Sequence, residues 1–379
     1  MHRKKRFKEF FLNVLALSIG LTVALILAEV ILRVFTPDVL EQAGITRAAM
    51  YTPDQDLGWK LEPSFEGIEQ KKDFLMHVRI NQEGFRDDPY DEAASGSVFR
   101  ILGVGDSFTF GFGVEHEKTY LELLEGYLNS SRPGHRNYQV FNTGVPGYSL
   151  EEYSMFLANS WKKFDPDLIV IGVDINDHTD IQPHPKYDVA HGYIIDHQSN
   201  DADQNSERNT NETATLTRFK IFLYERLYLY RFLSRAKRNI SARRQVEAAV
   251  TARIHREAEK AWEKASERLD HIRDLAEEND IGLVLVFIPH RSQVHPGIAG
   301  DAHIISGYFD DLDQRLESYC RKNDILFANL LPYLVESAQR GEISYFLETD
   351  AHWNSNGHEL AAIVIHGLLV QEFFAKEDK

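Results

Sequence analysis

The sequence predicts an α/β fold: a parallel sheet of about five strands with helices on both faces, preceded by an N-terminal transmembrane helix. Two observations indicate this class. From Phe99 onward, short aliphatic runs bounded by turn residues alternate with stretches of helical periodicity, which is typical of parallel strands that are buried on both faces. Before that, an uncharged apolar run follows a basic N-terminus, as in a membrane-spanning helix.

The N-terminal segment predicts a membrane anchor. Residues 10–28 carry no charge, and about 20 apolar residues suffice for a helix to cross the hydrocarbon core. A cytoplasmic tail over residues 1–9 is indicated by the cations that precede this run, namely Arg3, Lys4, Lys5, Arg6 and Lys8. We therefore expect a single anchor over residues 10–35 in an inner membrane, with the remainder in the periplasm. A cleaved signal peptide is the alternative, but the run exceeds a signal core and no clear small-residue cleavage site follows.

After the anchor, residues 36–97 are expected to form an extended leader of short β elements, and residues 98–379 the α/β domain. Strands are expected at residues 99–105, 138–144, 167–174, 281–289 and 325–330. Helices are expected at residues 117–130, 150–163, 255–279, 306–322 and 354–375. A flavodoxin-like arrangement of these elements brings the carboxyl ends of the strands to one edge of the sheet, where ligands bind.

A helical insertion at about residues 197–250 interrupts this alternation. It begins with a polar stretch and continues into a basic, aromatic helix over residues 218–238. That helix could lie on an anionic membrane surface or hold a partner of an envelope complex. The simpler expectation is that it packs its apolar stripe on the domain.

The composition argues against several kinds of partner and cofactor. The net charge of −16 argues against nucleic-acid binding, which needs a basic surface. Cys320 is the single cysteine, so neither an intrachain disulfide nor a cysteine metal site can form. Asp174, His178 and His184 lie close together in the sequence but match no ligand spacing. We therefore expect no metal and no cofactor.

Residues suited to acyl transfer follow three of the predicted strands. Ser107 follows the first strand, as a nucleophile would, although a serine in this place also caps helices. Gly144 and Gly147 follow the second strand, where a glycine can leave its N–H open to an oxyanion or simply make a turn. Asn176 follows the third strand, either as an amide donor or as the start of a turn.

The last loop of the predicted domain supplies a candidate base. Asp350 and His352 precede a predicted helix, and a carboxylate beside an imidazole can orient it as a general base. His358 lies a turn inside that helix, so we expect it to be structural. None of the four stretches decides alone between catalysis and ordinary structure, but their combination favours a catalytic site.

That combination resembles the SGNH, or GDSL-type, hydrolase superfamily over about residues 99–366, apart from the insertion at residues 197–250. Its four blocks match as Gly105-Asp106-Ser107, as NTGVPGYS over residues 142–149, as Asp174-Ile175-Asn176-Asp177 and as Asp350-Ala351-His352. The third block lacks its usual leading glycine, and the fourth is one residue shorter than the usual D-x-x-H. The resemblance implies a nucleophile at Ser107 and an oxyanion hole with Gly147 and Asn176. It also implies that Asp350 and His352 complete the catalytic triad.

The function implied by the resemblance is that of a serine-dependent ester hydrolase, which removes O-acyl or O-acetyl groups from an envelope or exported glycan through an acyl-enzyme. The D-x-H-W arrangement ending at Trp353 is similar to membrane-linked relatives that O-acetylate exported polysaccharides, so an O-acetyltransferase is the alternative. A domain outside the cytoplasm has no acyl-CoA supply, which favours the esterase. A non-catalytic glycan-binding member of the same fold and a scaffold of an envelope complex are further alternatives.

Overall fold

The computed structural model describes residues 13, 17–31, 48–89, 98–131, 137–175, 177, 187–190, 192–196, 252–295, 311–340, 345–347 and 350–377. The chain divides into two compact units, one of Met1–Ile45 with Asp203–Ala248 and one of Thr46–Ala202 with Ala249–Lys379. The second unit contains the sheet and every residue of the site described below. The predicted insertion and its helix over residues 218–238 lie outside the described residues.

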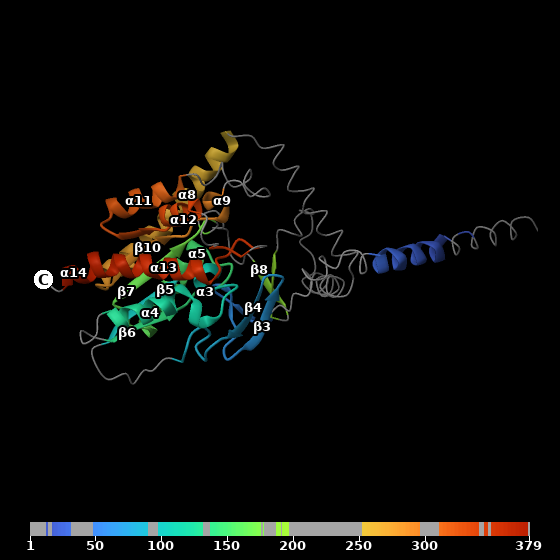
Figure 1. Ribbon diagram of the computed structural model, residues 1–379, viewed down its shortest axis with the longest axis horizontal. Helices are drawn as coiled ribbons and strands as arrows, with labels where there is room; N and C mark the ends of the chain where they lie inside the picture. Colours follow the sequence, from blue (N-terminus) through green and yellow to red (C-terminus); the bar gives the residue numbers. More distant parts are fainter. Residues whose placement is uncertain are drawn as a thin grey trace, which may run out of the picture. The chain divides into compact units, whose positions relative to one another are not determined.

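Five parallel strands form the main sheet of the second unit (Figure 1). They are β5 (Val98–Val104), β6 (Asn137–Asn142), β7 (Leu168–Val173), β10 (Gly282–Phe287) and β11 (Leu326–Asn329). Their spatial order is β11-β10-β7-β5-β6, which is the flavodoxin-like order when the strands are counted along the chain. β7 is buried over its whole length because it has a strand on either side and helices over both faces. The predicted α/β sheet is confirmed.

Helices cover both faces of this sheet, as predicted. On one face lie α5 (Leu150–Ser160), α8 (Ala252–Glu278) and α11 (Leu312–Lys322). On the other lie α4 (Tyr120–Ser131), α12 (Leu331–Gln339) and α13 (Ser355–Leu368). Alternate side chains of a strand point to opposite faces, so Ile169 and Ile171 of β7 enter the first core while Leu168 and Val170 enter the second.

Short elements extend or link these helices. A 3-10 turn at Trp161–Lys163 continues α5, and a π turn at Leu369–Phe373 followed by α14 (Phe374–Glu377) continues α13. The linking elements are α3 (Ser107–Phe110), the 3-10 turn η1 (His116–Lys118) and α9 (Arg291–Val294). Two of them, α3 and α9, follow β5 and β10 at the carboxyl edge of the sheet, where the candidate site lies.

The leader forms two antiparallel hairpins that belong to the core of the second unit. β1 (Tyr51–Asp54) pairs with β2 (Gly58–Leu61), and β3 (Glu66–Lys71) pairs with β4 (Phe74–Arg79). Four of their side chains are buried in the same cluster as those of β7 and α5: Trp59, Leu61, Met76 and Val78. The leader is therefore packed against the α/β sheet. A further hairpin joins β8 (Tyr187–Ala190) to β9 (Tyr193–Asp196).

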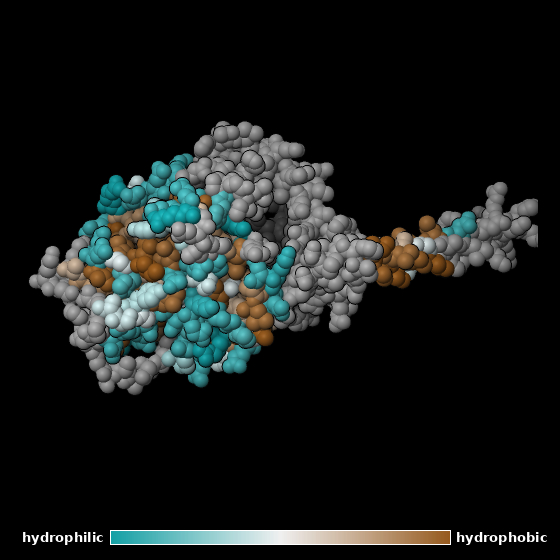
Figure 2. Space-filling view, in the orientation of Figure 1, coloured by the Kyte–Doolittle hydropathy of each residue, from teal (hydrophilic) through white to brown (hydrophobic). Residues whose placement is uncertain are grey.

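In the first unit, residues 17–31 form a helix that exposes apolar side chains (Figure 2). The exposed residues are Leu17, Ile19, Leu21, Val23, Leu25, Ile26, Leu27, Val30 and Ile31. Within the part of the chain that the structure describes, no helix combines the length and the apolar character needed to cross a membrane. The predicted anchor over residues 10–35 extends past both ends of this helix into residues outside the description.

Candidate active site

Ser107 is the first residue of α3, directly after the turn that follows β5. The cap of this helix is Asp106, whose Oδ1 accepts the Phe108 N–H at 2.9 Å. Ser107 is therefore not needed as the cap, which was the structural alternative for this residue. Gly105 makes the turn possible, because a Cβ at this position would lie 1.9 Å from Thr109 Oγ1.

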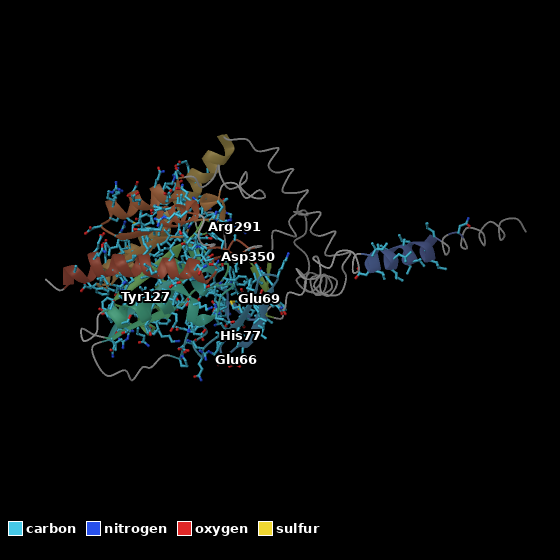
Figure 3. The ribbon with its side chains drawn as sticks, viewed as in Figure 1. Glu66, Glu69, His77, Tyr127, Arg291 and Asp350 are labelled. Carbon is cyan, nitrogen blue, oxygen red and sulfur yellow. The ribbon has the colours of Figure 1, made fainter. Side chains whose placement is uncertain are left out.

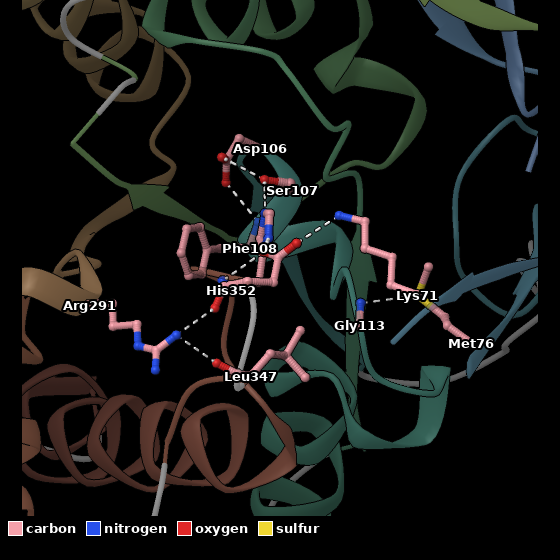
Figure 4. Close-up of polar contacts among 10 residues, drawn as sticks. Lys71, Met76, Asp106, Ser107, Phe108, Gly113, Arg291, Leu347 and His352 are labelled. Carbon is pink, nitrogen blue, oxygen red and sulfur yellow. Dashed lines mark hydrogen bonds and ion pairs between the residues drawn. The ribbon is translucent and has the colours of Figure 1, made fainter. Parts of the chain in front are cut away.

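Ser107, His352 and Asp350 form a continuous chain of hydrogen bonds (Figure 4). Ser107 Oγ lies 2.7 Å from His352 Nε2, although 245 residues separate the two in the sequence. His352 Nδ1 contacts Asp350 Oδ1. Because a carboxylate can only accept, Nδ1 carries the proton and Nε2 is left to accept the serine hydroxyl. This is the arrangement of a nucleophile, a base and the group that orients the base.

The short sequence spacing between Asp350 and His352 is compatible with these hydrogen bonds among Ser107, His352 and Asp350. Asp350 Oδ1 also accepts a hydrogen bond from the backbone N–H of His352, at 3.1 Å. The Asp350 side chain therefore forms an Asx turn with the backbone two residues further on. The same oxygen therefore meets both the backbone and the ring of His352. One intervening residue is enough to bring the ring back onto the carboxylate.

Aromatic side chains pack against the imidazole of His352. The ring centroids of Phe108 and Phe112 each lie 4.9 Å from that of His352. Trp353, which is 1% exposed, packs edge-on against Phe108 at 5.2 Å. These contacts restrict the orientation of the imidazole, and they give the tryptophan of the D-x-H-W arrangement a structural role.

Lys71 of the leader is ion-paired with Asp350, at 2.7 Å from Nζ to Oδ2. Burial opposes ionisation of Asp350, but the hydrogen bond and charge of His352, together with the charge of Lys71, outweigh it and lower the pKa of Asp350 below its ordinary value. The carboxylate is therefore ionised at neutral pH. Nothing in the local sequence identifies Lys71, because the contact joins residues 279 positions apart.

Arg86 of the leader holds the turn that follows Ser107. Its side chain is fully buried and donates to three carbonyl oxygens of this turn, those of Phe110 at 3.0 Å, Gly111 at 2.8 Å and Val114 at 2.7 Å. Burial lowers the pKa of Arg86 to about 10. The sequence analysis did not predict this role, because the partners of Arg86 are backbone oxygens of a distant turn and leave no pattern in the sequence around it.

The two glycines after β6 differ in their surroundings. Gly147 is exposed and has a φ of 88°, a conformation that favours glycine. Gly144 is buried, and a Cβ there would lie 2.3 Å from the backbone nitrogen of Phe110. Gly144 is therefore a packing residue, whereas Gly147 is exposed. The oxyanion role of Gly147 stays a prediction. Asn176, the third expected donor, lies outside the described residues.

Asp177 and His358 have structural positions. Asp177 is buried; it accepts the Tyr153 hydroxyl at 2.9 Å and the Asp174 N–H at 2.8 Å, and so ties the loop after β7 to α5. His358 is also buried, and its Nδ1 accepts the Tyr120 N–H at 3.3 Å. Burial lowers the pKa of His358 to about 3. This is the structural role expected for His358.

Three buried carboxyl groups lie next to Ser107. Asp106, Asp174 and Asp177 each bring an oxygen within 4.8 Å of the others. Burial and mutual repulsion raise the pKa of Asp177 well above its ordinary value, and burial raises that of Asp106. Ser107 Oγ lies 3.0 Å from Asp106 Oδ2. The Ser107 hydroxyl therefore lies within hydrogen-bond distance of two groups, Asp106 Oδ2 and His352 Nε2.

Among the residues that the structure describes, two groups of side chains could in principle hold a cation. One is the buried acid group beside Ser107, and the other consists of Asp87, His116 and Glu122. Several of these side chains already have partners in the protein: Asp87 accepts the Asn142 N–H at 2.9 Å, and His116 lies 3.3 Å from Glu122. Burial raises the pKa of Asp87 to about 7. The triad needs neither group as a ligand set.

Known proteins resemble parts of this chain. Residues 249–378 match the family model of the SGNH hydrolase-like domain of acetyltransferase AlgX. This match confirms the resemblance to SGNH hydrolases. It includes Asp350 and His352 but not Ser107 or Gly147.

Two curated relatives have the same name. The probable alginate O-acetylase AlgJ of Pseudomonas syringae pv. tomato is 32% identical over 101 residues, which cover 27% of this chain and 25% of that protein. The protein of the same name from Pseudomonas putida is 29% identical over 91 residues, covering 24% and 23%. The chain thus spans about a quarter of the length of these relatives. Among solved structures, the acetyl xylan esterase AlAXEase has a TM-score of 0.41 and 12% identity, covering 71% of this chain and 98% of that one.

Proposed function

We propose that this chain is a serine-dependent acyl-transfer enzyme that acts on an O-acetylated or otherwise O-acylated glycan through an acyl-enzyme. The observation that carries the proposal is the hydrogen-bonded chain from Ser107 through His352 to an ionised Asp350. A merely glycan-binding domain would not need a serine hydroxyl directed at an imidazole nitrogen whose other nitrogen contacts a carboxylate. The triad therefore favours the enzyme over the binding module.

The first half of the proposed reaction forms the acyl-enzyme. Ser107 Oγ attacks the ester carbonyl carbon while its proton passes to His352 Nε2. Asp350 stabilises the resulting imidazolium, and the backbone N–H groups of Ser107 and Gly147, with the amide of Asn176, donate to the oxyanion. The ester C–O bond then breaks, and His352 returns the proton to the leaving sugar oxygen.

The second half releases the acyl group. A water molecule or a sugar hydroxyl gives its proton to His352 Nε2 and attacks the acyl carbon. The bond to Ser107 Oγ breaks, and the proton returns to Ser107. Water yields a carboxylic acid and hence an esterase, whereas a sugar hydroxyl yields a transferase.

We place hydrolysis first, because a domain outside the cytoplasm has no acyl-CoA supply. Transfer to a polysaccharide is the second candidate, supported by the similarity to proteins named alginate O-acetylase. We also propose that residues 10–35 anchor the chain in the inner membrane and leave the α/β domain in the periplasm. The exposed apolar side chains of residues 17–31 and the basic N-terminus support this anchor.

Tracing an acetyl group tests the proposed activity. Purified protein is given 4-nitrophenyl acetate with and without an unacetylated polysaccharide, and both free acetate and polymer-bound acetyl are measured. We expect acetate release by the wild type, and a loss of about 10⁴-fold or more in Ser107→Ala. Acetyl on the polymer would identify the transferase.

Ser130→Ala is the matched control for this experiment. The Ser130 hydroxyl is exposed and donates to Gly126 O within α4, so its removal is expected to leave the rate unchanged. A Ser107→Ala variant as active as Ser130→Ala would contradict the proposed function.

A further inference from the structure

Lys71 lies at the end of β3, on the leader hairpin, and reaches the carboxylate of Asp350 (Figure 4). The two side chains are 26% and 14% exposed, so the ion pair is largely withdrawn from water. The two carboxylate oxygens are divided between two partners. Oδ1 meets His352, and Oδ2 accepts from Lys71.

The hairpin that carries Lys71 is attached to the turn that follows the nucleophile. Lys71 Nζ lies 4.6 Å from the ring centroid of Phe112, a cation–π distance. Phe74 of β4 packs edge-on against Phe112 at 5.4 Å, and the Gly113 N–H donates to Met76 Sδ at 3.3 Å. Phe112 in turn packs against His352. The ring of Phe112 thus contacts both the ammonium group of Lys71 and the imidazole of His352.

We propose that Lys71 is a positioning residue of the triad: its ammonium group holds the Asp350 carboxylate in the orientation that keeps His352 Nε2 directed at Ser107. The inference rests on the proposed acyl-transfer function. It adds a group from the leader, which lies outside the part of the chain that matches the SGNH-like family model. Lys71 itself does not reach Ser107; it acts through Asp350.

Other charged groups also face Asp350 and His352. Asp106, next to Ser107, interacts electrostatically with His352, and so does His358 of α13. Arg291 of α9, labelled with Asp350 in Figure 3, donates to Leu347 O at 3.0 Å and lies 3.5 Å from the backbone oxygen of Asp350 (Figure 4). Arg291 is thus directed at backbone oxygens, whereas Lys71 contacts the carboxylate itself.

Removal of the Lys71 charge has a predictable effect on pH dependence. Without the cation, the negative charge of Asp350 acts on His352 with less compensation and favours the imidazolium form. An imidazolium cannot accept the serine proton. The acid limb of the pH–rate profile is therefore expected to move to higher pH, and a purely structural role of Lys71 would not move it.

The experiment compares Lys71→Met, Lys71→Gln and Lys71→Arg in the full chain, with 4-nitrophenyl acetate as the substrate. Lys71→Met is expected to lower kcat about 10-fold with little change in KM, because Asp350 loses one of its two partners and the base is misdirected. Lys71→Gln keeps a donor but not the charge, so it is expected to show the same shift of the acid limb. Lys71→Arg is expected to restore much of kcat and the wild-type limb.

Lys72→Met is the matched control. Lys72 is the exposed neighbour on the same hairpin, so this variant makes the same change of charge without touching Asp350. It is expected to behave as the wild type. Thermal melting of all variants separates a loss of folding from a loss of orientation, and Lys71→Gln and Lys71→Arg keep the test decisive if Lys71→Met unfolds.

Two results would overturn the inference, and they differ. If the wild type is active and Ser107→Ala is not, while the Lys71 variants keep the wild-type kcat and acid limb, Lys71 does not position the triad and the acyl-transfer function stands. If the wild type reacts no faster than Ser107→Ala, the acyl-transfer function fails and the role of Lys71 fails with it.

Discussion

Ser107 illustrates how one residue acquires a role from its surroundings. In the sequence, a serine between a strand and a helix is as well explained by capping as by catalysis. In the structure, Asp106 caps α3, and the Ser107 hydroxyl lies at hydrogen-bond distance from His352. Asp106 thus caps the helix in place of Ser107, whose hydroxyl lies within hydrogen-bond distance of both His352 and Asp106.

Asp350 allows a prediction at the same scale. Asp350→Asn is expected to reduce turnover about 10⁴-fold, because an amide can donate to His352 Nδ1 and so favours the tautomer in which Nε2 cannot accept. Steady-state rates with 4-nitrophenyl acetate measure the loss. Asp165→Asn is a suitable control, since Asp165 is 85% exposed and its ion pair with Arg100 lies at the surface. Equal turnover in both variants would contradict the proposed role of Asp350.

The stability of Asp350→Asn should also depend on pH. The pKa of Asp350 is lowered in the folded protein, so its ion pairs contribute stability above the ordinary carboxyl pKa of about 4. That contribution is lost as the pH falls through the lowered pKa. The free energy of unfolding of Asp350→Asn is therefore expected to lie below that of the wild type at pH 7, with a smaller gap below about pH 4. Urea titrations at the two pH values measure this gap, and a constant gap would contradict the ion-pair explanation.

At the scale of elements, the sequence predicted those features that depend on residues close together in the chain. The five strands follow from aliphatic runs, and α4, α5, α8, α11 and α13 follow from helical periodicity; each lies close to its expected bounds. The sequence analysis did not predict α12 (Leu331–Gln339). The four motif blocks were also placed by local patterns, because turns and caps are short-range features.

Long-range contacts explain what the sequence could not predict. The Lys71–Asp350 ion pair and the hydrogen bonds that Arg86 donates to the turn after Ser107 join the leader to distant parts of the sequence. Hydrophobic periodicity does not predict such contacts. The packing of β3 and β4 against the nucleophile turn depends on Phe74, Met76 and their partners across the core. The short Asp350–His352 spacing could be interpreted only when the turn that brings carboxylate and ring together was seen.

For the whole molecule, the proposed anchor predicts where the protein resides in the cell. The full chain is expected in the membrane fraction, resistant to washing with high salt and released by detergent, because residues 10–35 supply a span of apolar side chains. Charges within that span, as in Leu21→Arg with Leu25→Arg, are expected to move it to the soluble fraction. Ile68→Arg with Leu75→Arg, on exposed apolar positions of the leader hairpin, is the matched control. A wild-type chain found in the soluble fraction would contradict the anchor.

The central proposal is that the molecule brings together its leader, the turn after β5 and the loop before α13 to activate Ser107. Labelling with a fluorophosphonate, located by mass spectrometry of the digested full chain, tests this most directly. We predict a single adduct on the peptide that contains Ser107, absent in Ser107→Ala and formed far more slowly in His352→Gln. An unlabelled Ser107, or labelling that is as fast without His352, would contradict a nucleophile activated by this triad.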